Sequence, residues 1–239
     1  NFHKKIGLKR NLKILSFSLK NKSATTNLDS ISKVKSKYKI SININKKKIY
    51  FYSNSFFEND LKNLLATITI ISIFKDVHKL DKNIFYDHKV TKGRGDIVKL
   101  KLFKNFFYLV DESYNSNPLS LKSALIKFDM IKTDNSKKHL VLGDMLELGK
   151  YSKRLHIEIG KNINKTSLKN VNVIGDHVKW IFNNLNKNRR GLVIKKKSQI
   201  IDLIKNNLNN NDYLMIKGSN STGLNSLVNQ IKKGKINAL

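Results

Sequence analysis

The chain has 239 residues, of which 47 are lysine or arginine and 17 are aspartate or glutamate, so its formal net charge is +30. It contains no cysteine, which excludes a disulfide framework, a thiolate nucleophile and a cysteine-ligated zinc site in this chain. The longest apolar run, residues 64–74, is shorter than the roughly 20 residues of a membrane-spanning helix, so we expect one or two globular domains without a membrane span.

The basic charge has two interpretations. A strongly positive surface is typical of proteins that bind nucleic acid or an anionic membrane. Alternatively, the excess reflects a proteome-wide enrichment in lysine, asparagine and isoleucine, which AT-rich codons encode. The basic residues here are mostly lysines scattered over every segment, whereas bidentate contacts to bases and phosphates favour arginine. The second interpretation is favoured, and we predict no nucleic-acid partner.

The first hundred residues predict a few strands followed by helices. Residues 38–45 alternate apolar and polar side chains, the period of a half-buried strand, and residues 45–47 suit a turn. From Asn59 to Phe74 apolar residues crowd one broad face, which predicts a mostly buried helix. The predicted elements are strands at 12–18, 38–45 and 48–52 and helices at 59–74 and 77–86. The glycine-rich residues 92–95 then form a flexible break.

From residue 106 onward, strands and helices alternate regularly. The predicted strands are 106–110, 140–142, 171–174, 192–194 and 213–216, and the predicted helices are 118–131, 152–163, 176–185, 198–208 and 222–231. Pro118 suits the first turn of its helix, and Ser198 suits a helix cap. This spacing indicates βαβ units, hence an α/β fold with a parallel, doubly wound sheet and right-handed crossovers.

In such sheets, ligands bind at the carboxyl ends of the strands. The short motifs that follow the predicted strands are therefore the candidate site, and they lie at residues 111–115, 143–145, 175–176 and 217–219.

Several motifs combine in a specific order. They are Gly93-Arg94, DESYNSNP at 111–118, LGDMLELG at 142–149, His156 and KGS at 217–219, preceded by a helix start with asparagines at 59–63. Taken alone, DESYNSNP is a polar turn that caps a helix. In this order and spacing, the set resembles the Mur ligase family, and within it the members that add D-alanyl-D-alanine. DESYN-NP and GDM-ELG are the most specific pieces.

The resemblance covers essentially the whole chain and implies its domain organisation. Residues 1–105 are similar to the C-terminal half of the family's central ATP-binding domain, and residues 106–239 to its Rossmann-like C-terminal domain with a mainly parallel sheet. Because the chain opens on Asn1 in the middle of a domain, we expect it to be part of a longer protein. The family's P-loop has no counterpart here, since no G-x-x-x-x-G-K-[ST] sequence occurs, so we expect the fragment alone to be inactive.

The resemblance also implies a reaction. ATP would activate the terminal carboxylate of UDP-N-acetylmuramoyl-tripeptide as an acyl phosphate, and the amine of D-alanyl-D-alanine would attack it to give an amide, ADP and phosphate. The protein's task in such chemistry is to neutralise charge and hold the reactants in line. The implied cofactors are ATP and Mg²⁺, with metal ligands expected upstream, and the implied protein is a cytoplasmic monomer with no membrane partner.

Four residues in and after the glycine-rich break are implied to face the nucleotide. Arg94 resembles the family arginine that reaches an ATP phosphate, which suits a permanently charged planar group, although one more solvated cation is the plainer interpretation. Its flanking glycines allow close approach of the backbone. Glu112 stands where the family has a carboxylate that contacts the ATP ribose. Tyr114 and Asn115 would pack and hydrogen-bond at the nucleotide.

Asn63 resembles the asparagine that pairs with the adenine edge from the start of a helix. A polar residue on the exposed face of that helix is an equally simple interpretation. The family's usual His-Asn pair is Asn59-Asp60 in this sequence, which departs from the pattern.

The remaining implied site residues face the peptide substrates. Asp144, after a strand and a glycine, would hold the incoming amine or organise the closed site, as a catalytic residue alongside the nucleotide arginine. His156 is the best-placed histidine, although a lone helical histidine is more often structural. Lys217 and Ser219 belong to a turn near the substrate peptide, in which the family's following arginine is Asn220. No histidine has metal-ligand spacing, and no metal ligand is predicted.

Two other functions remain open from the sequence. A sister Mur ligase that adds a different amino acid would share the fold and the ATP chemistry. A non-catalytic, basic Rossmann-like module that binds nucleic acid would instead show strongly salt-dependent retention on DNA.

Overall fold

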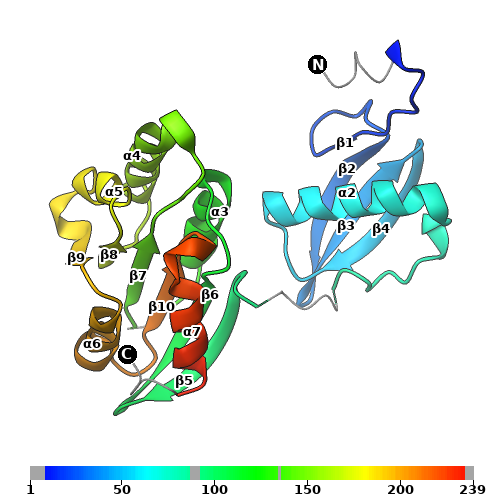
Figure 1. The fold of residues 1–239 in the computed structure, drawn as a ribbon. Helices are drawn as coiled ribbons and strands as arrows, with labels where there is room; N and C mark the ends of the chain where they lie inside the picture. Colours follow the sequence, from blue (N-terminus) through cyan, green and yellow to red (C-terminus); the bar gives the residue numbers. More distant parts are fainter. Residues whose placement is uncertain (1–8, 87–91, 134–135, 235–239) are drawn as a thin grey trace. The chain divides into compact units, whose positions relative to one another are not determined.

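The computed structural model describes residues 9–86, 92–133 and 136–234. Contacts define two compact units, Asn1–Lys89 and Val90–Leu239. Figure 1 shows that each unit is built on its own sheet with helices packed against it. The division lies between Lys89 and Val90, earlier than the boundary predicted after residue 105. The difference arises because residues 96–102 form a strand that pairs with the strand after it and so belongs to the second unit. The assignment of the two parts to particular domains stays a prediction.

The first unit contains a four-stranded sheet. Its strands, in spatial order, are β1 (Phe17–Ser18), β2 (Thr26–Val34), β3 (Lys37–Ile44) and β4 (Lys47–Ser53). The strands β2, β3 and β4 are antiparallel, and β1 is parallel to β2. The predicted strands at 38–45 and 48–52 are confirmed, and Asn45 and Lys46 form the tight hairpin turn between them with positive φ angles of 48° and 66°.

Two strands of this unit differ from the prediction. The strand expected at 12–18 is reduced to the two residues of β1, and β2 is not predicted at all. In β2, serine, aspartate and lysine separate the few apolar residues, and a β-bulge between Leu28 and Ser30 breaks the alternation of faces.

Helix α2 (Glu58–Phe74) packs on one face of the sheet, as Figure 1 shows. Its Leu61, Leu65 and Ile68 share an apolar core with Ile42 and Phe51 of the strands. The exposed apolar side chains on its other side are Ile70, Ile73 and Phe74. The helix is therefore buried on one side only, which is less than predicted. Among the described residues, no helix is both long and apolar enough to cross a membrane.

The second helix predicted in this unit, at residues 77–86, is wrong. That stretch contains only the short 3-10 helix η1 (Val77–Lys79). The carboxylates of Asp76 and Asp81 each accept a hydrogen bond from the backbone N–H two residues later, at 3.0 Å and 2.9 Å. Such local bonds satisfy the backbone in turns and compete with a continuous helix.

The second unit contains a six-stranded sheet in the order β5-β6-β10-β7-β8-β9. The strands are β5 (Asp96–Leu102), β6 (Asn105–Glu112), β7 (Lys138–Gly143), β8 (Val171–Ile174), β9 (Arg190–Ile194) and β10 (Tyr213–Lys217). Only β5, which the sequence does not predict, is antiparallel to its neighbour, and the other neighbouring pairs are parallel. The predicted α/β fold with a mainly parallel sheet is confirmed.

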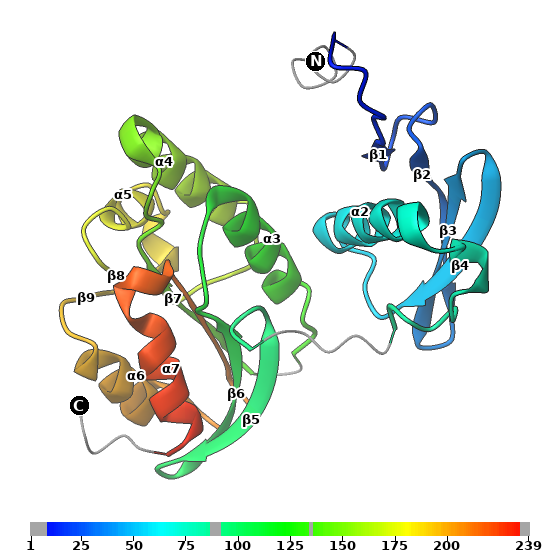
Figure 2. The same ribbon diagram turned by 45° about the vertical axis from the view of Figure 1, so that its right-hand side comes forward.

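Helices cover both faces of this sheet, which Figure 2 shows from a second direction. The α-helices are α3 (Pro118–Asp129), α4 (Ser152–Ile163), α5 (Lys179–Asn183), α6 (Ser198–Asn207) and α7 (Leu224–Lys232), with short 3-10 helices η2 (Gly149–Tyr151), η3 (Lys187–Arg189) and η4 (Asn220–Thr222). Helices α3, α4 and α5 share one apolar core, and α6 and α7 share the other. Because side chains alternate along a strand, Val110 enters the first core while Phe107 and Leu109 enter the second.

The chain order brings the candidate motifs together. Strand β10, last in the sequence, lies between β6 and β7. The connections after β6 and β7 lead to α3 and α4 on one face, whereas the connection after β10 leads to α7 on the other. A crevice outside the carboxyl ends of strands is expected at such a switch of direction.

Phe107→Ala should destabilise the second unit by about 3–5 kcal/mol, because it removes a large side chain from a close-packed core. The matched control is Phe106→Ala, whose side chain is 43% exposed and should cost less than about 1 kcal/mol. Urea titration followed by the fluorescence of Trp180, which lies on α5 and is the one tryptophan of the sequence, measures both. Equal losses would contradict the burial described here.

Candidate functional site

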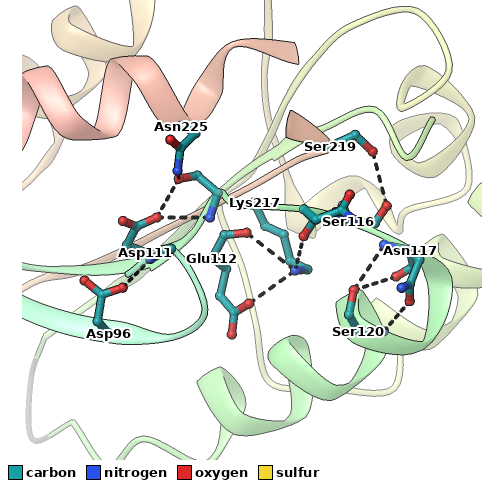
Figure 3. A network of polar contacts seen from close by, with 12 residues as sticks. Asp96, Asp111, Glu112, Ser116, Asn117, Ser120, Lys217, Ser219 and Asn225 are labelled. Atoms are coloured by element: carbon teal, nitrogen blue, oxygen red, sulfur yellow. Dashed lines mark hydrogen bonds and ion pairs between the residues drawn. The ribbon is translucent and has the colours of Figure 1, made fainter. Parts of the chain in front are cut away.

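A buried ion pair lies where β6 and β10 end side by side. Glu112 and Lys217 are register partners at the last positions of these strands. The Nζ atom of Lys217 lies 3.2 Å from Oε2 of Glu112 and donates to the carbonyl oxygen of Asn115 at 3.0 Å. Figure 3 shows the side chains of Glu112 and Lys217 pointing toward each other. Burial lowers the pKa of Lys217, and the Glu112 carboxylate opposes that shift. Because the lysine side chain is 1% exposed, removing one member of the pair would leave a buried charge unpaired.

The Gly93–Gly95 turn lies against the start of the loop after β6. The N–H of Tyr114 donates to the carbonyl oxygen of Gly93 at 3.1 Å, and the exposed guanidinium of Arg94 stacks 4.7 Å from the Tyr114 ring. Gly93 has a φ of 79°, and a Cβ there would come within 2.9 Å of Cβ of Tyr114, so this approach requires glycine. The structure thus brings Arg94, Tyr114 and Glu112 together, as predicted for one site.

The turn from Asn115 to Asn117 is rigidly held. Asn117 begins α3 with a reciprocal capping box to Ser120, which confirms the capping interpretation of the motif. Asn115 is exposed, and its side-chain oxygen accepts from the N–H of Ser116 at 2.7 Å. The carbonyl oxygen of Ser116 in turn accepts a hydrogen bond from the Ser219 hydroxyl at 3.2 Å.

Ser219 links three loops at the strand ends. Besides its bond to the loop after β6, its N–H donates to the carbonyl oxygen of Asp144 at 3.0 Å, and its hydroxyl accepts from the N–H of Leu146 at 2.9 Å. Its side chain is buried. Ser219 therefore ties the loop after β10 to the loops after β6 and β7.

The Asp144 carboxylate is used to hold the neighbouring loop. Its Oδ1 accepts from the N–H of Val178 at 2.7 Å, and its Oδ2 accepts from the N–H of Asp176 at 3.1 Å. A Cβ at Gly175 would come within 2.6 Å of this carboxylate. Asp144 follows β7 as predicted, and both of its oxygens already bind backbone N–H groups of the loop that leads to α5.

His156 is completely buried on α4, and its two shortest hydrogen bonds are to backbone groups. The N–H of Met145 donates to its Nε2 at 3.2 Å, so this nitrogen carries a lone pair, and its Nδ1–H donates to the carbonyl oxygen of Ser152 at 2.8 Å. His156 is thus neutral and fixes the loop after β7, the structural role that the sequence left open beside substrate contact.

Asn63 lies in the first unit, where it is exposed on α2. Of the neighbouring pair, Asp60 accepts a hydrogen bond from the Ser55 hydroxyl, and Asn59 is partly exposed. The structure therefore gives Asn63 an accessible side chain and leaves its nucleotide-facing role a prediction.

Sequence patterns miss one set of residues at this end of the sheet. The ammonium group of Lys232, on the last turn of α7, lies 2.5 Å from carboxylate oxygens of both Asp96 and Asp111. Asp111 belongs to the DESYNSNP motif, but nothing in a lysine-rich sequence distinguishes Lys232 from its neighbours. Only the fold brings these residues together.

Chemically, the strand ends present an accessible cation, an aromatic ring and a carboxylate above a buried lysine. Arg94 can bind an anionic oxygen, and Glu112 can accept hydrogen bonds from hydroxyls. Among residues 9–86, 92–133 and 136–234, no group of three histidine, aspartate or glutamate side chains is placed to hold a metal ion.

Comparison with known families and proteins gives consistent results. Residues 93–220 match the family model of the Mur ligase, glutamate ligase domain. A UDP-N-acetylmuramoyl-tripeptide--D-alanyl-D-alanine ligase of Rickettsia prowazekii is 29% identical over 172 residues, which is 72% of this chain and 36% of that protein. The enzyme of the same name from Buchnera aphidicola subsp. Baizongia pistaciae is 27% identical over 94% of this chain and 48% of its own length. The chain spans about half or less of these relatives.

Solved structures share the fold. MurF ligase from Thermotoga maritima, crystallised in complex with ADP, has a TM-score of 0.71 at 18% identity and covers 98% of this chain and 51% of its own. MurF from Acinetobacter baumannii has the same TM-score at 16% identity, covering 98% of this chain and 50% of its own.

His156 should make stability depend on pH. Burial lowers its pKa in the folded protein, despite the opposing bond to the backbone of Ser152. Between the ordinary value of about 6.5 and the lower folded value, the unfolded chain binds more protons than the folded one. The stability that neutral His156 contributes is therefore complete above about pH 6.5 and is lost as the pH falls toward the folded pKa.

His156→Gln should flatten this decline in urea titrations made at successive pH values. Burial also lowers the pKa of His139, so part of the decline should persist in both proteins. If the free energies of unfolding of the two proteins fall in parallel from neutral pH downward, the protonation of His156 is not linked to folding.

Proposed function

The chain belongs to the Mur ligase family, and we propose that it serves in an ATP-dependent amide ligase that joins D-alanyl-D-alanine to UDP-N-acetylmuramoyl-tripeptide in peptidoglycan precursor synthesis. In this proposal, the first unit belongs to the C-terminal half of a central ATP-binding domain, and the second unit, which begins at Val90 rather than at the predicted residue 106, is a C-terminal ligase domain. The protein would work in the cytoplasm as a monomer, with these two substrates and no nucleic-acid partner.

The observation that carries the proposal is the cluster of Arg94, Tyr114 and Glu112 above Lys217 at the strand ends. Lys217 holds one oxygen of Glu112, so the carboxylate is oriented before any ligand arrives. The other oxygen of Glu112 remains near the glycine turn, where a Cβ on Gly95 would come within 3.0 Å of it. An oriented carboxylate beside a permanently charged guanidinium suits a ligand that carries both hydroxyls and phosphates.

The proposed roles follow from these positions. Arg94 contacts a phosphate of ATP and stabilises negative charge that develops during transfer. Glu112 accepts from the ribose hydroxyls, and Tyr114 and Asn115, both exposed, pack at the nucleotide. For Asn63, on α2 of the first unit, contact with the adenine edge is proposed from the family resemblance alone.

For the peptide substrates, we propose that four buried residues act mainly by holding the surrounding loops in place. They are Asp144, His156, Lys217 and Ser219. Each is buried and bonds to backbone or to Glu112, so each fixes a loop that borders the substrates. Asp144 would meet the incoming amine only in addition to its two backbone bonds. Mg²⁺, which accompanies ATP, is proposed to bind residues other than the described ones.

The choice of amino acid rests on the relatives rather than on the fold. The compared curated relatives are named D-alanyl-D-alanine ligases at 27–29% identity. The fold alone does not separate them from a sister enzyme, since UDP-N-acetylmuramate-alanine ligase from Thermotoga maritima shares it with a TM-score of 0.66 at 16% identity.

A polypeptide that contains this chain should release ADP from ATP only when UDP-N-acetylmuramoyl-tripeptide and D-alanyl-D-alanine are both present. Coupled detection of ADP, with each substrate omitted in turn and with L-alanine or D-glutamate in place of the dipeptide, measures this. ADP release that prefers a single amino acid would favour the sister ligase instead.

Arg94→Ala should lower that turnover by at least roughly tenfold, or about 1.4 kcal/mol of barrier. The matched control is Arg154→Ala on α4, because Arg154 is also exposed and stacks on a tyrosine, 5.2 Å from the Tyr151 ring. Turnover should be unchanged in the control. Equal turnover in both variants would remove Arg94 from the site.

A further inference from the structure

Two carboxylates face each other beside the candidate site. Asp96 and Asp111 are directly opposed register partners on the antiparallel strands β5 and β6. Like charges in this arrangement destabilise a strand pair, and Asp111 is only 1% exposed, so water cannot screen its charge. The ammonium group of Lys232 resolves the conflict by lying 2.5 Å from Oδ2 of each carboxylate.

The other oxygen of each carboxylate holds a functional turn. Oδ1 of Asp96 accepts from the N–H of Gly93 at 2.7 Å, in the turn that carries Arg94. Oδ1 of Asp111 accepts from the N–H and the hydroxyl of Ser113 at 3.0 Å and 2.6 Å, in the turn that carries Tyr114. Each aspartate therefore connects the lysine to one of the two turns that meet at the stacked arginine and tyrosine.

Two further bonds close the network. The N–H of Gly95 donates to the carbonyl oxygen of Asp111 at 2.7 Å, which joins the glycine turn to β6. The side-chain amide of Asn225, on the first turn of α7, donates to the Ser113 hydroxyl at 3.2 Å. Figure 3 shows Asp96, Asp111 and Asn225 around this point. Side chains from both ends of α7 therefore connect to the two turns, Asn225 directly and Lys232 through the two aspartates.

We propose that Lys232, acting through Asp96 and Asp111, is a positioning residue that holds the Gly93–Gly95 turn against the loop after β6 and so places Arg94 for the nucleotide phosphate. The inference rests on the proposed function for the role of Arg94. None of the three residues needs to touch the nucleotide, because the side chains of Lys232, Asp96 and Asp111 are only 17%, 21% and 1% exposed.

The network differs from an ordinary surface ion pair. Exposed pairs contribute little, because solvent screens them and two long side chains lose freedom. Here one cation joins two carboxylates, and these carboxylates also accept hydrogen bonds from the N–H of Gly93 and from the N–H and hydroxyl of Ser113. Although burial alone would lower the pKa of Lys232, its bonds to Asp111 and Asp96 raise that pKa above its usual value, so the lysine stays charged.

The first test needs no nucleotide. In the 239-residue chain, Lys232→Met should speed amide hydrogen exchange at Gly93, Gly95 and Ser113 by at least about tenfold, because these N–H groups lose a fixed partner. The control is Lys233→Met, which removes the same charge from the adjacent, exposed residue and should leave these rates unchanged. Equal rates in the two variants would overturn the network.

Lys232→Met with Asp96→Asn keeps the result interpretable if the single variant folds poorly. The double variant removes the cation together with one of the opposed charges, and the asparagine oxygen can still accept from Gly93. Slow exchange at Gly93 should return in part. If the double variant exchanges as fast as Lys232→Met alone, charge opposition is not what the lysine relieves.

The second test separates positioning from simple destabilisation. In a polypeptide that contains this chain and is active, Lys232→Met should lower kcat at saturating ATP by at least about tenfold when Arg94 is present, and not further in an Arg94→Ala background. Equal losses in both backgrounds would overturn positioning through Arg94. If Lys232→Met speeds amide exchange but the unmodified polypeptide shows no ATP turnover with any of the substrates, the proposed function is wrong and the network itself stands.

Discussion

The buried ammonium group of Lys217 is the constraint on which the arrangement at the strand ends depends. Strand β10 lies between β6 and β7, so its last residue has strands on both sides and its side chain is 1% exposed. A charge in this position persists only with partners, and the structure supplies the Glu112 carboxylate and the Asn115 carbonyl oxygen. Meeting this requirement orients Glu112 and shapes the turn that follows β6.

Around this pair, buried polar side chains are used to fix loops. Asp144 and Ser219 bind backbone groups of loops that are distant in sequence, and His156 binds the backbone of Met145 in the loop that leads to its own helix. Loops at the end of a parallel sheet would otherwise be mobile, and a site that must align several reactants needs its supporting residues held in place. The accessible groups, Arg94 and Tyr114, therefore rest on a rigid base rather than on flexible segments.

Sequence patterns predict the second unit well, because its strands are apolar runs separated by amphipathic helices. They fail where the signal is short or interrupted: β2 carries a bulge, β5 follows directly on the glycine turn, and the expected helix at 77–86 gives way to aspartate-capped turns. Motif order assigns Arg94, Glu112 and Tyr114 to one site, and they lie close together in the structure. It does not reveal the contact between Asp96 and Lys232, which are 136 residues apart, nor that both oxygens of Asp144 bind backbone. Those facts come from tertiary geometry alone.

A crystal structure of the active polypeptide with a non-hydrolysable ATP analogue would examine the strand-end cluster most directly. We expect the Arg94 guanidinium within hydrogen-bond distance of a phosphate oxygen and the free oxygen of Glu112 on a ribose hydroxyl, with the Glu112–Lys217 pair intact. A nucleotide bound elsewhere, with Arg94 and Glu112 both facing solvent, would show that the strand ends of this unit are not its binding site.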